Sequence, residues 1–117
     1  MDVTEIVESN YSISFDTENA TVKCNGYFRL RGSEEYAPMM NLLNDVADLG
    51  LGVVNMDLTE LEFLNSSGIN TLSKFVLRLR KLGASQLIIS ANEEYPWQKK
   101  SLRNFQKLLP DTKINFS

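Results

Sequence analysis

The order of apolar and polar residues divides the chain into alternating strand-like and helix-like segments. Residues 11–16 (YSISFD) alternate as a half-buried strand does, and residues 20–31 (ATVKCNGYFRLR) form a second strand-like run. The polar residues DTEN connect the two, and such a short connection favours an antiparallel hairpin. Gly26 interrupts the second run, which predicts a bulge or a close approach of two backbone segments.

Three further segments have the periodicity of amphipathic helices. The first covers residues 32–50, with Ser33 as its expected N-cap and Gly50 as its expected stop. The second begins near Ser67 and carries one wide apolar stripe. The stripe consists of Ile69, Leu72, Phe75, Val76, Leu79 and Leu82. The third predicted helix covers residues 96–109 and starts with a proline at its first position.

Short apolar strands separate these helices, and Glu60 and Glu62 are expected in a polar turn after the first of them. The strands are predicted at residues 52–58, 85–91 and 112–116. The resulting order is β-β-α-β-α-β-α-β, and strands that alternate with helices imply right-handed crossovers. We therefore predict one α/β domain over residues 1–117, with a mixed, mostly parallel sheet and an N-terminal β-hairpin.

Composition removes several classes of function. The 117-residue chain contains no histidine and one cysteine, Cys24, so neither a Ser-His-Asp triad nor a histidine-ligated or multi-thiolate zinc site can form. The net charge of −3 gives no general reason to expect nucleic-acid binding. No apolar run reaches the roughly 20 residues of a membrane span, and the first residues lack the pattern of a signal peptide. We expect a cytoplasmic protein in which Cys24 is packed inside a strand.

The stretch FLNSSGINTL, residues 63–72, carries the most suggestive chemistry. It lies between an apolar strand and an amphipathic helix, where α/β proteins collect functional residues. The first amides of a helix have no intrahelical partner and carry partial positive charge, so a phosphate on a serine there meets free donors. Gly68 would leave room for the backbone of a partner. The structural alternative is that the serines only cap the helix.

The longer stretch VVNMDLTELEFLNSSGINTL resembles the signature of STAS domains, specifically that of the bacterial anti-sigma-factor antagonists. In that family an apolar strand and Asp-Leu-Ser/Thr precede apolar-Asp-Ser-Ser-Gly-apolar and an amphipathic helix. The matching positions are Asp57, Leu58, Thr59, Phe63, Leu64, Ser66, Ser67, Gly68, Ile69 and Leu72. The predicted order of strands and helices is similar to the STAS fold over essentially the whole chain.

The resemblance implies a non-enzymatic partner-switching module that needs neither a metal nor a cofactor. The oligomeric state stays open, with a monomer favoured. Ser66 matches the serine that an anti-sigma factor with serine kinase activity phosphorylates and that a PP2C-type phosphatase dephosphorylates. The unphosphorylated domain binds the kinase, and phosphorylation breaks that complex. The expected partner surface consists of Asn65, Ser66, Ser67, Gly68, Ile69, Asn70 and Arg29.

Two positions depart from the family pattern. Asn65 stands where the family usually has aspartate, which keeps the shape and loses one charge. Arg29 stands where the family has the aspartate of Gly-Glu-Leu-Asp, so the surface that meets the partner differs in charge. An alternative role for Arg29 and Arg31 is to attract a phosphorylated Ser66.

Other interpretations of the same residues stay open. The domain can be a STAS-like ligand-sensing or scaffold domain without a phospho-switch. A small hydrolase using Ser66 or Ser67 is disfavoured, because neither a histidine nor a Ser-x-x-Lys pattern is available as base.

The basic segment YPWQKKSLRNFQKLL also has two interpretations. It is either a helix for membranes or acidic partners, or a core stripe with a solvated basic face, and the second is favoured. The stripe would consist of Trp97, Leu102, Phe105 and Leu109.

Overall fold

Strands and helices follow the order β-β-β-α-β-α-β-α-β in the computed structural model, which describes residues 3–117. The strands are β1 (Glu5–Val7), β2 (Tyr11–Asp16), β3 (Thr21–Phe28), β4 (Val53–Leu64), β5 (Gln86–Ala91) and β6 (Lys113–Phe116). The helices are α1 (Gly32–Asp48), α2 (Ser66–Leu82) and α3 (Pro96–Leu108). The predicted α/β class and hairpin are confirmed. β1 was not predicted, because its three residues are too few to show a period.

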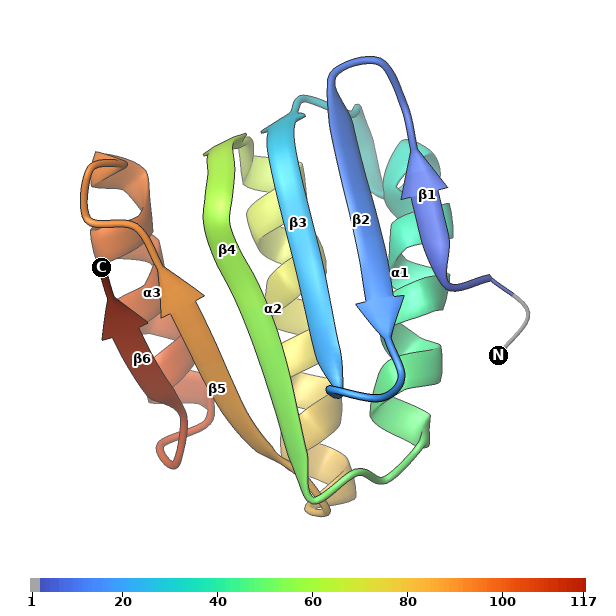
Figure 1. Ribbon diagram of the computed structural model, residues 1–117, viewed down its shortest axis with the longest axis vertical. Helices are drawn as coiled ribbons and strands as arrows, with labels where there is room; N and C mark the ends of the chain where they lie inside the picture. Colours follow the sequence, from blue (N-terminus) through green and yellow to red (C-terminus); the bar gives the residue numbers. More distant parts are fainter. Residues whose placement is uncertain (1–2) are drawn as a thin grey trace.

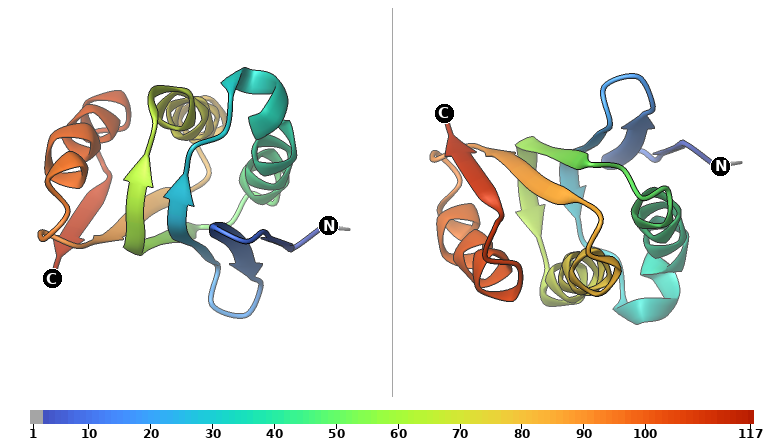
Figure 2. Two further views of the ribbon diagram at one scale, coloured as in Figure 1. Left: turned by 90° about the horizontal axis from the view of Figure 1, so that it is seen from above. Right: turned by 90° about the horizontal axis from the view of Figure 1, so that it is seen from below.

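The six strands form one sheet in their order along the chain (Figure 1). β1, β2 and β3 pair antiparallel, whereas β3 to β6 pair parallel. Each parallel crossover moves one strand further in the same direction, so crossovers of one hand place all three helices on the same face (Figure 2). The other face of the sheet is not covered by helices and carries half-buried polar residues such as Ser14, Lys23, Asn55 and Ser90.

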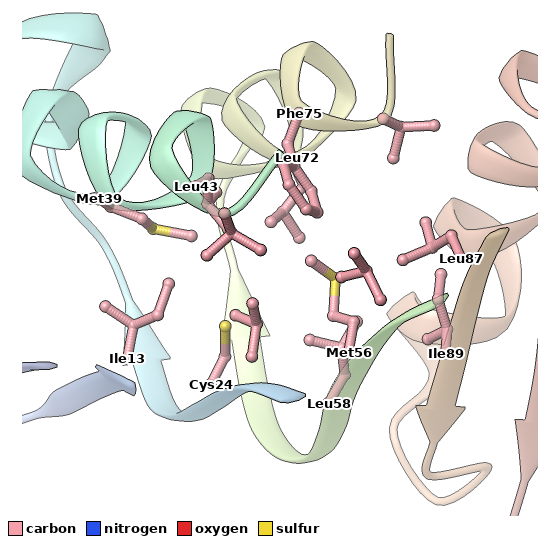
Figure 3. Close-up of a cluster of buried hydrophobic side chains, with 14 of the residues drawn as sticks. Ile13, Cys24, Met39, Leu43, Met56, Leu58, Leu72, Phe75, Leu87 and Ile89 are labelled. Carbon is pink, nitrogen blue, oxygen red and sulfur yellow. The ribbon is translucent and has the colours of Figure 1, made fainter. Parts of the chain in front are cut away.

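The hydrophobic core lies between the helices and the covered face of the sheet (Figure 3). Alternate residues of the strands point into it, including Ile13 of β2, Cys24 of β3 and Met56 of β4. Leu72 and Phe75 of α2 meet them from the helical side. Cys24 is fully buried as predicted, and burial raises the pKa of its thiol to about 12.

β4 is longer than the sequence suggested, because it continues through the residues that were expected to form a polar turn. The register with β3 shifts twice, and at each shift β4 contains one extra residue. Each bulge resets the alternation, so Leu58, Leu61 and Leu64 all face the core. The expectation that Glu60 and Glu62 lie in a turn is therefore wrong, and both are exposed residues of the strand.

Gly26 lies beside one of these bulges and has a φ of +93°. A Cβ at this position would overlap the carbonyl oxygen of Asn10, so the predicted close backbone approach is confirmed.

The helix ends agree with the sequence except at the start of α1. Gly50, with a φ of +65°, follows α1, and Gly83, with a φ of +67°, caps α2. Ser33 is not the N-cap that we expected, because α1 begins at Gly32 after Arg31. The carboxylate of Glu35 instead accepts a hydrogen bond of 2.9 Å from the amide of Arg31. Within residues 3–117, none of the helices has the length and apolar character that crossing a membrane requires.

Candidate functional site

Ser66 is the first residue of α2, and its side chain is exposed. The residue before it, Asn65, is the N-cap: its backbone is extended and its side chain accepts a hydrogen bond from the amide of Gly68 at 2.9 Å. The amide of Ile69 donates to the carbonyl of Asn65 at 2.9 Å. The amides of Ser66 and Ser67 are left without an acceptor inside the helix. The helix is therefore capped by Asn65, and the hydroxyl of Ser66 is not needed for that purpose.

Asn65 also joins the ends of three elements. Its Oδ1 accepts from the hydroxyl of Tyr36 at 2.7 Å, and its Nδ2 donates to the carbonyl of Leu30 at 2.7 Å. Its amide donates to the carbonyl of Phe28 at 3.2 Å. An asparagine satisfies all of these groups because its side chain has both an acceptor and a donor. A carboxylate has no donor for Leu30, which gives a structural reason for an asparagine at this position.

Tyr36 of α1 fixes this corner from the core side. The residue is fully buried. Its hydroxyl oxygen lies 3.1 Å from the carbonyl oxygen of Phe28, in addition to its hydrogen bond with Oδ1 of Asn65. Burial raises the pKa of Tyr36 from 10.0 to about 12, so the phenol stays a neutral hydrogen-bond donor to a higher pH than an ordinary tyrosine does.

Gly68 is buried and faces Tyr36 and Leu64. A Cβ at this position would lie 2.7 Å from the hydroxyl oxygen of Tyr36 and would overlap the side chain of Leu64. The explanation we expected, room for a partner's backbone, is corrected: the domain's own packing requires the glycine.

The other residues of the expected partner surface differ in accessibility. Asn70 is exposed, whereas Ser67 and Ile69 are half-buried. The carbonyl of Ser67 accepts from the hydroxyl of Thr71 at 3.0 Å, and Ile69 packs against the core. Ser66 and Asn70 are thus the most accessible side chains of the first turn.

Arg29 lies at the same end of the sheet, just beyond β3. Its guanidinium stacks 5.3 Å from the ring centre of Tyr27 and 5.0 Å from that of Phe63. Both rings are exposed, Tyr27 by 42% and Phe63 by 37%. The hydroxyl of Tyr27 donates to the carboxylate of Glu62 at 3.1 Å, and this hydrogen bond raises the pKa of Tyr27. We call Tyr27, Arg29 and Phe63 the arginine–aromatic patch. Residues of these types are over-represented among the strongest contacts in protein interfaces.

Hydrogen bonds from Gln98, which the sequence did not single out, and from Trp97 hold α3 to the bulged part of β4. Gln98 is fully buried, and its Nε2 donates to the carbonyls of Leu58 at 2.7 Å and Leu61 at 3.0 Å. Its Oε1 accepts from the amide of Asn92 at 2.8 Å. Trp97, half-buried, donates to the carbonyl of Glu62 at 3.0 Å. The signal was present, because Gln98 precedes Leu102 by four residues on the same helical stripe.

The carboxylates near the site have structural contacts. Asp57 accepts hydrogen bonds from the amide of Thr59 at 3.0 Å and from its hydroxyl at 2.6 Å, which supports the strand at its first bulge. Within the described chain, no three His, Cys, Asp or Glu side chains lie together as a group that could hold a metal.

The sequence matches no protein-family model and no curated protein. Its fold is similar to that of solved structures from Pseudomonas aeruginosa. A chain in the crystal structure of the diguanylate cyclase SiaD with its activator SiaC is 14% identical, with a TM-score of 0.74 over 98% of this chain and 100% of that one. SiaC itself is 13% identical, with a TM-score of 0.67 over 100% of this chain and 97% of that one. At such identities the likeness shows the fold.

Proposed function

We propose that this domain is a non-enzymatic regulatory module that binds a protein partner through the start of α2 and is released when Ser66 is phosphorylated. The observation that supports the proposal most directly is the position of Ser66: an exposed hydroxyl at the first position of a helix whose cap is supplied by Asn65. A serine that is free of a capping role and accessible is a suitable acceptor for a phosphoryl group.

The physical basis of the switch is a change of charge at the positive end of a helix. The first turn of α2 contains no acidic residue. A phosphate adds about −1.5 to −2 charges, and the free domain tolerates it because the unpaired amides and the helix dipole favour an anion. A desolvated contact that accepts a neutral hydroxyl excludes the same anion unless the partner supplies a positive charge. Phosphorylation is therefore expected to break the complex without unfolding the domain.

The partners follow from the STAS resemblance and from the structural neighbours. The resemblance suggests a serine kinase of the anti-sigma type and an opposing PP2C-type phosphatase, both in the cytoplasm. SiaC is named as the activator of a diguanylate cyclase. This supports an enzyme as a second kind of client, beside the sigma factor that the resemblance suggests. The arginine–aromatic patch lies at the same end of the sheet, on the face that the helices do not cover, and offers a partner a second contact area.

The test uses the purified domain, a candidate serine kinase from the same genome and Mg-ATP, with the modified residue mapped by mass spectrometry. We expect a phosphoryl group on Ser66, and we expect it to be absent in Ser66→Ala. Ser67→Ala is the matched control, because it removes the neighbouring hydroxyl and should still be phosphorylated. Label that persists in Ser66→Ala would contradict the site. Ser66→Asp is expected to lose partner binding while its far-UV spectrum stays unchanged. Unchanged binding of Ser66→Asp would instead indicate a scaffold or ligand-sensing domain.

A further inference from the structure

The outward face of α3 carries a row of positive charges. Its members are Lys99, Lys100, Arg103 and Lys107, all exposed. They line a shallow groove of about 410 Å³ together with Pro96 and Asn104. The helix contains no acidic residue. α3 forms the end of the helical layer (Figure 2). We call the four cations the basic row.

The basic row is not required by the packing of α3. The side chains that fix the helix are Gln98, Leu102 and Phe105, which are buried on its other face. The membrane interpretation of this segment is also weakened, because its apolar side chains are used inside the domain and not on the basic face.

The helix dipole favours only part of the basic row. α1 has Glu34 and Glu35 in its first turn and α2 has Arg80 and Lys81 in its last turn, as the dipole favours. In α3, Lys107 likewise lies in the last turn, whereas Lys99 and Lys100 lie in the first half of the helix and gain no such stabilisation.

Within the basic row, the spacing of four residues between 99, 103 and 107 also brings like charges together. The side-chain ion pairs found within residues 3–117 are Lys23–Glu60 and Arg78–Asp48, and neither involves the basic row. An arrangement that costs local stability and is not compensated inside the domain is typical of a functional surface.

We infer that the basic row is a second docking surface, separate from the start of α2, and that it binds an acidic helix or segment of a partner protein. From Lys99 to Lys107 the row spans about 12 Å, with charges about 6 Å apart. Carboxylates four residues apart on a partner helix have the same spacing. A long polyanion such as duplex DNA would also meet the rest of a surface whose net charge is −3. A lipid surface would find no exposed large apolar side chain on α3 to insert.

The test measures the binding of a fluorescein-labelled alanine-based helical peptide with three glutamates four residues apart, by fluorescence anisotropy at low salt. A peptide with glutamine in place of glutamate is the ligand control. The triple variant Lys99→Gln, Arg103→Gln, Lys107→Gln is compared with the matched variant Lys74→Gln, Arg80→Gln, Lys81→Gln, which removes the same charge from α2. Because three exposed charge pairs are lost, we expect about tenfold weaker binding in the first variant and little change in the second.

Salt near 0.5 M is expected to abolish binding, because the attraction between exposed charges is then screened beyond roughly 4–5 Å. Three other results would contradict the proposal. No binding of the glutamate peptide at low salt, or equal loss in both triple variants, would overturn the proposal. Tighter binding of a random-sequence DNA oligonucleotide or of phosphatidylglycerol vesicles would overturn the choice of an acidic protein partner. None of these results depends on Ser66, so failure here is distinguishable from failure of the phospho-switch.

Discussion

Replacing Gly68 by alanine distinguishes a glycine required by packing from one that makes room for a partner. The new Cβ would lie 2.7 Å from the hydroxyl oxygen of Tyr36 and would overlap Leu64. Leu64 can relieve the overlap only by moving its Cγ, 2.9 Å from the new Cβ, as well as its closer Cδ1. The Tyr36 hydroxyl cannot move without weakening its contacts with Asn65 at 2.7 Å and Phe28 at 3.1 Å.

The magnitude follows from three terms. Overpacking costs about 1–3 kcal/mol, and weakening the buried hydrogen bonds of Tyr36 costs about another 1 kcal/mol. Replacing a helical glycine by alanine returns about 1 kcal/mol. The net expectation for Gly68→Ala is a loss of about 2 kcal/mol, which lowers the midpoint of urea unfolding by roughly 1 M.

Two further variants make the test specific. Gly52→Ala is the matched control, because a Cβ there meets no atom within 4 Å and the expected change is within about 0.5 kcal/mol. Tyr36→Phe removes the oxygen that the Cβ meets, so the double variant should lose less than the sum of the single variants by about 1 kcal/mol. A Gly68→Ala protein as stable as the wild type that fails to bind its partner would refute this reasoning and restore the partner-contact explanation.

Three other buried side chains have measurable consequences. Gln98→Leu leaves two carbonyls and one amide without a partner, so a loss of about 3 kcal/mol is expected in urea unfolding, and a loss below about 1 kcal/mol would contradict the hydrogen-bond assignment. Cys24, buried and with a pKa of about 12, should react with a thiol reagent only as fast as the domain opens, and a rapid reaction in buffer would show that it is accessible. Tyr36 has a folded pKa of about 12 against 10.0 for an ordinary tyrosine, so the unfolded state loses its proton first. The contribution of Tyr36 to stability should therefore be intact below pH 10 and fall as the pH rises towards 12, in addition to the loss that the buried thiol of Cys24 causes from about pH 9. The same slope between pH 10 and 12 in Tyr36→Phe would rule out this origin.

The sequence predicts the elements well where one period persists over several residues. Residues 11–16 form β2 within the predicted bounds, and each of the three helices lies where the apolar stripe placed it. Prediction failed in the second half of β4, because two bulges interrupt the alternation of buried and exposed residues there. The buried residues in this half are three apart: Leu58, Leu61 and Leu64. Prediction also failed for Leu82, which was assigned to the apolar stripe and is 48% exposed at the end of α2.

The candidate site was predictable in part. Its location and the motif around Ser66 come from local sequence, and the exposure of that side chain agrees with the expected role. The function of Asn65 was not predictable, because its side-chain partners Leu30 and Tyr36 are 35 and 29 residues away along the chain. The inward orientation of Gly68 likewise depends on where α1 packs, which the sequence pattern of α2 does not contain.

The two departures from the family pattern differ in their physical consequences. Asn65 directs its side chain inward, where its amide group binds Leu30, so the substitution is compensated within the domain. Arg29 is exposed and its guanidinium lies over two aromatic rings, so it changes the surface itself, by about two charge units relative to an aspartate. A guanidinium has five N–H donors, which can bind a carboxylate. Arg29 is therefore the position at which the proposed partner surface differs most in charge from that of the anti-sigma-factor antagonists, whereas the proposed switch at Ser66 keeps its helix cap with asparagine at position 65.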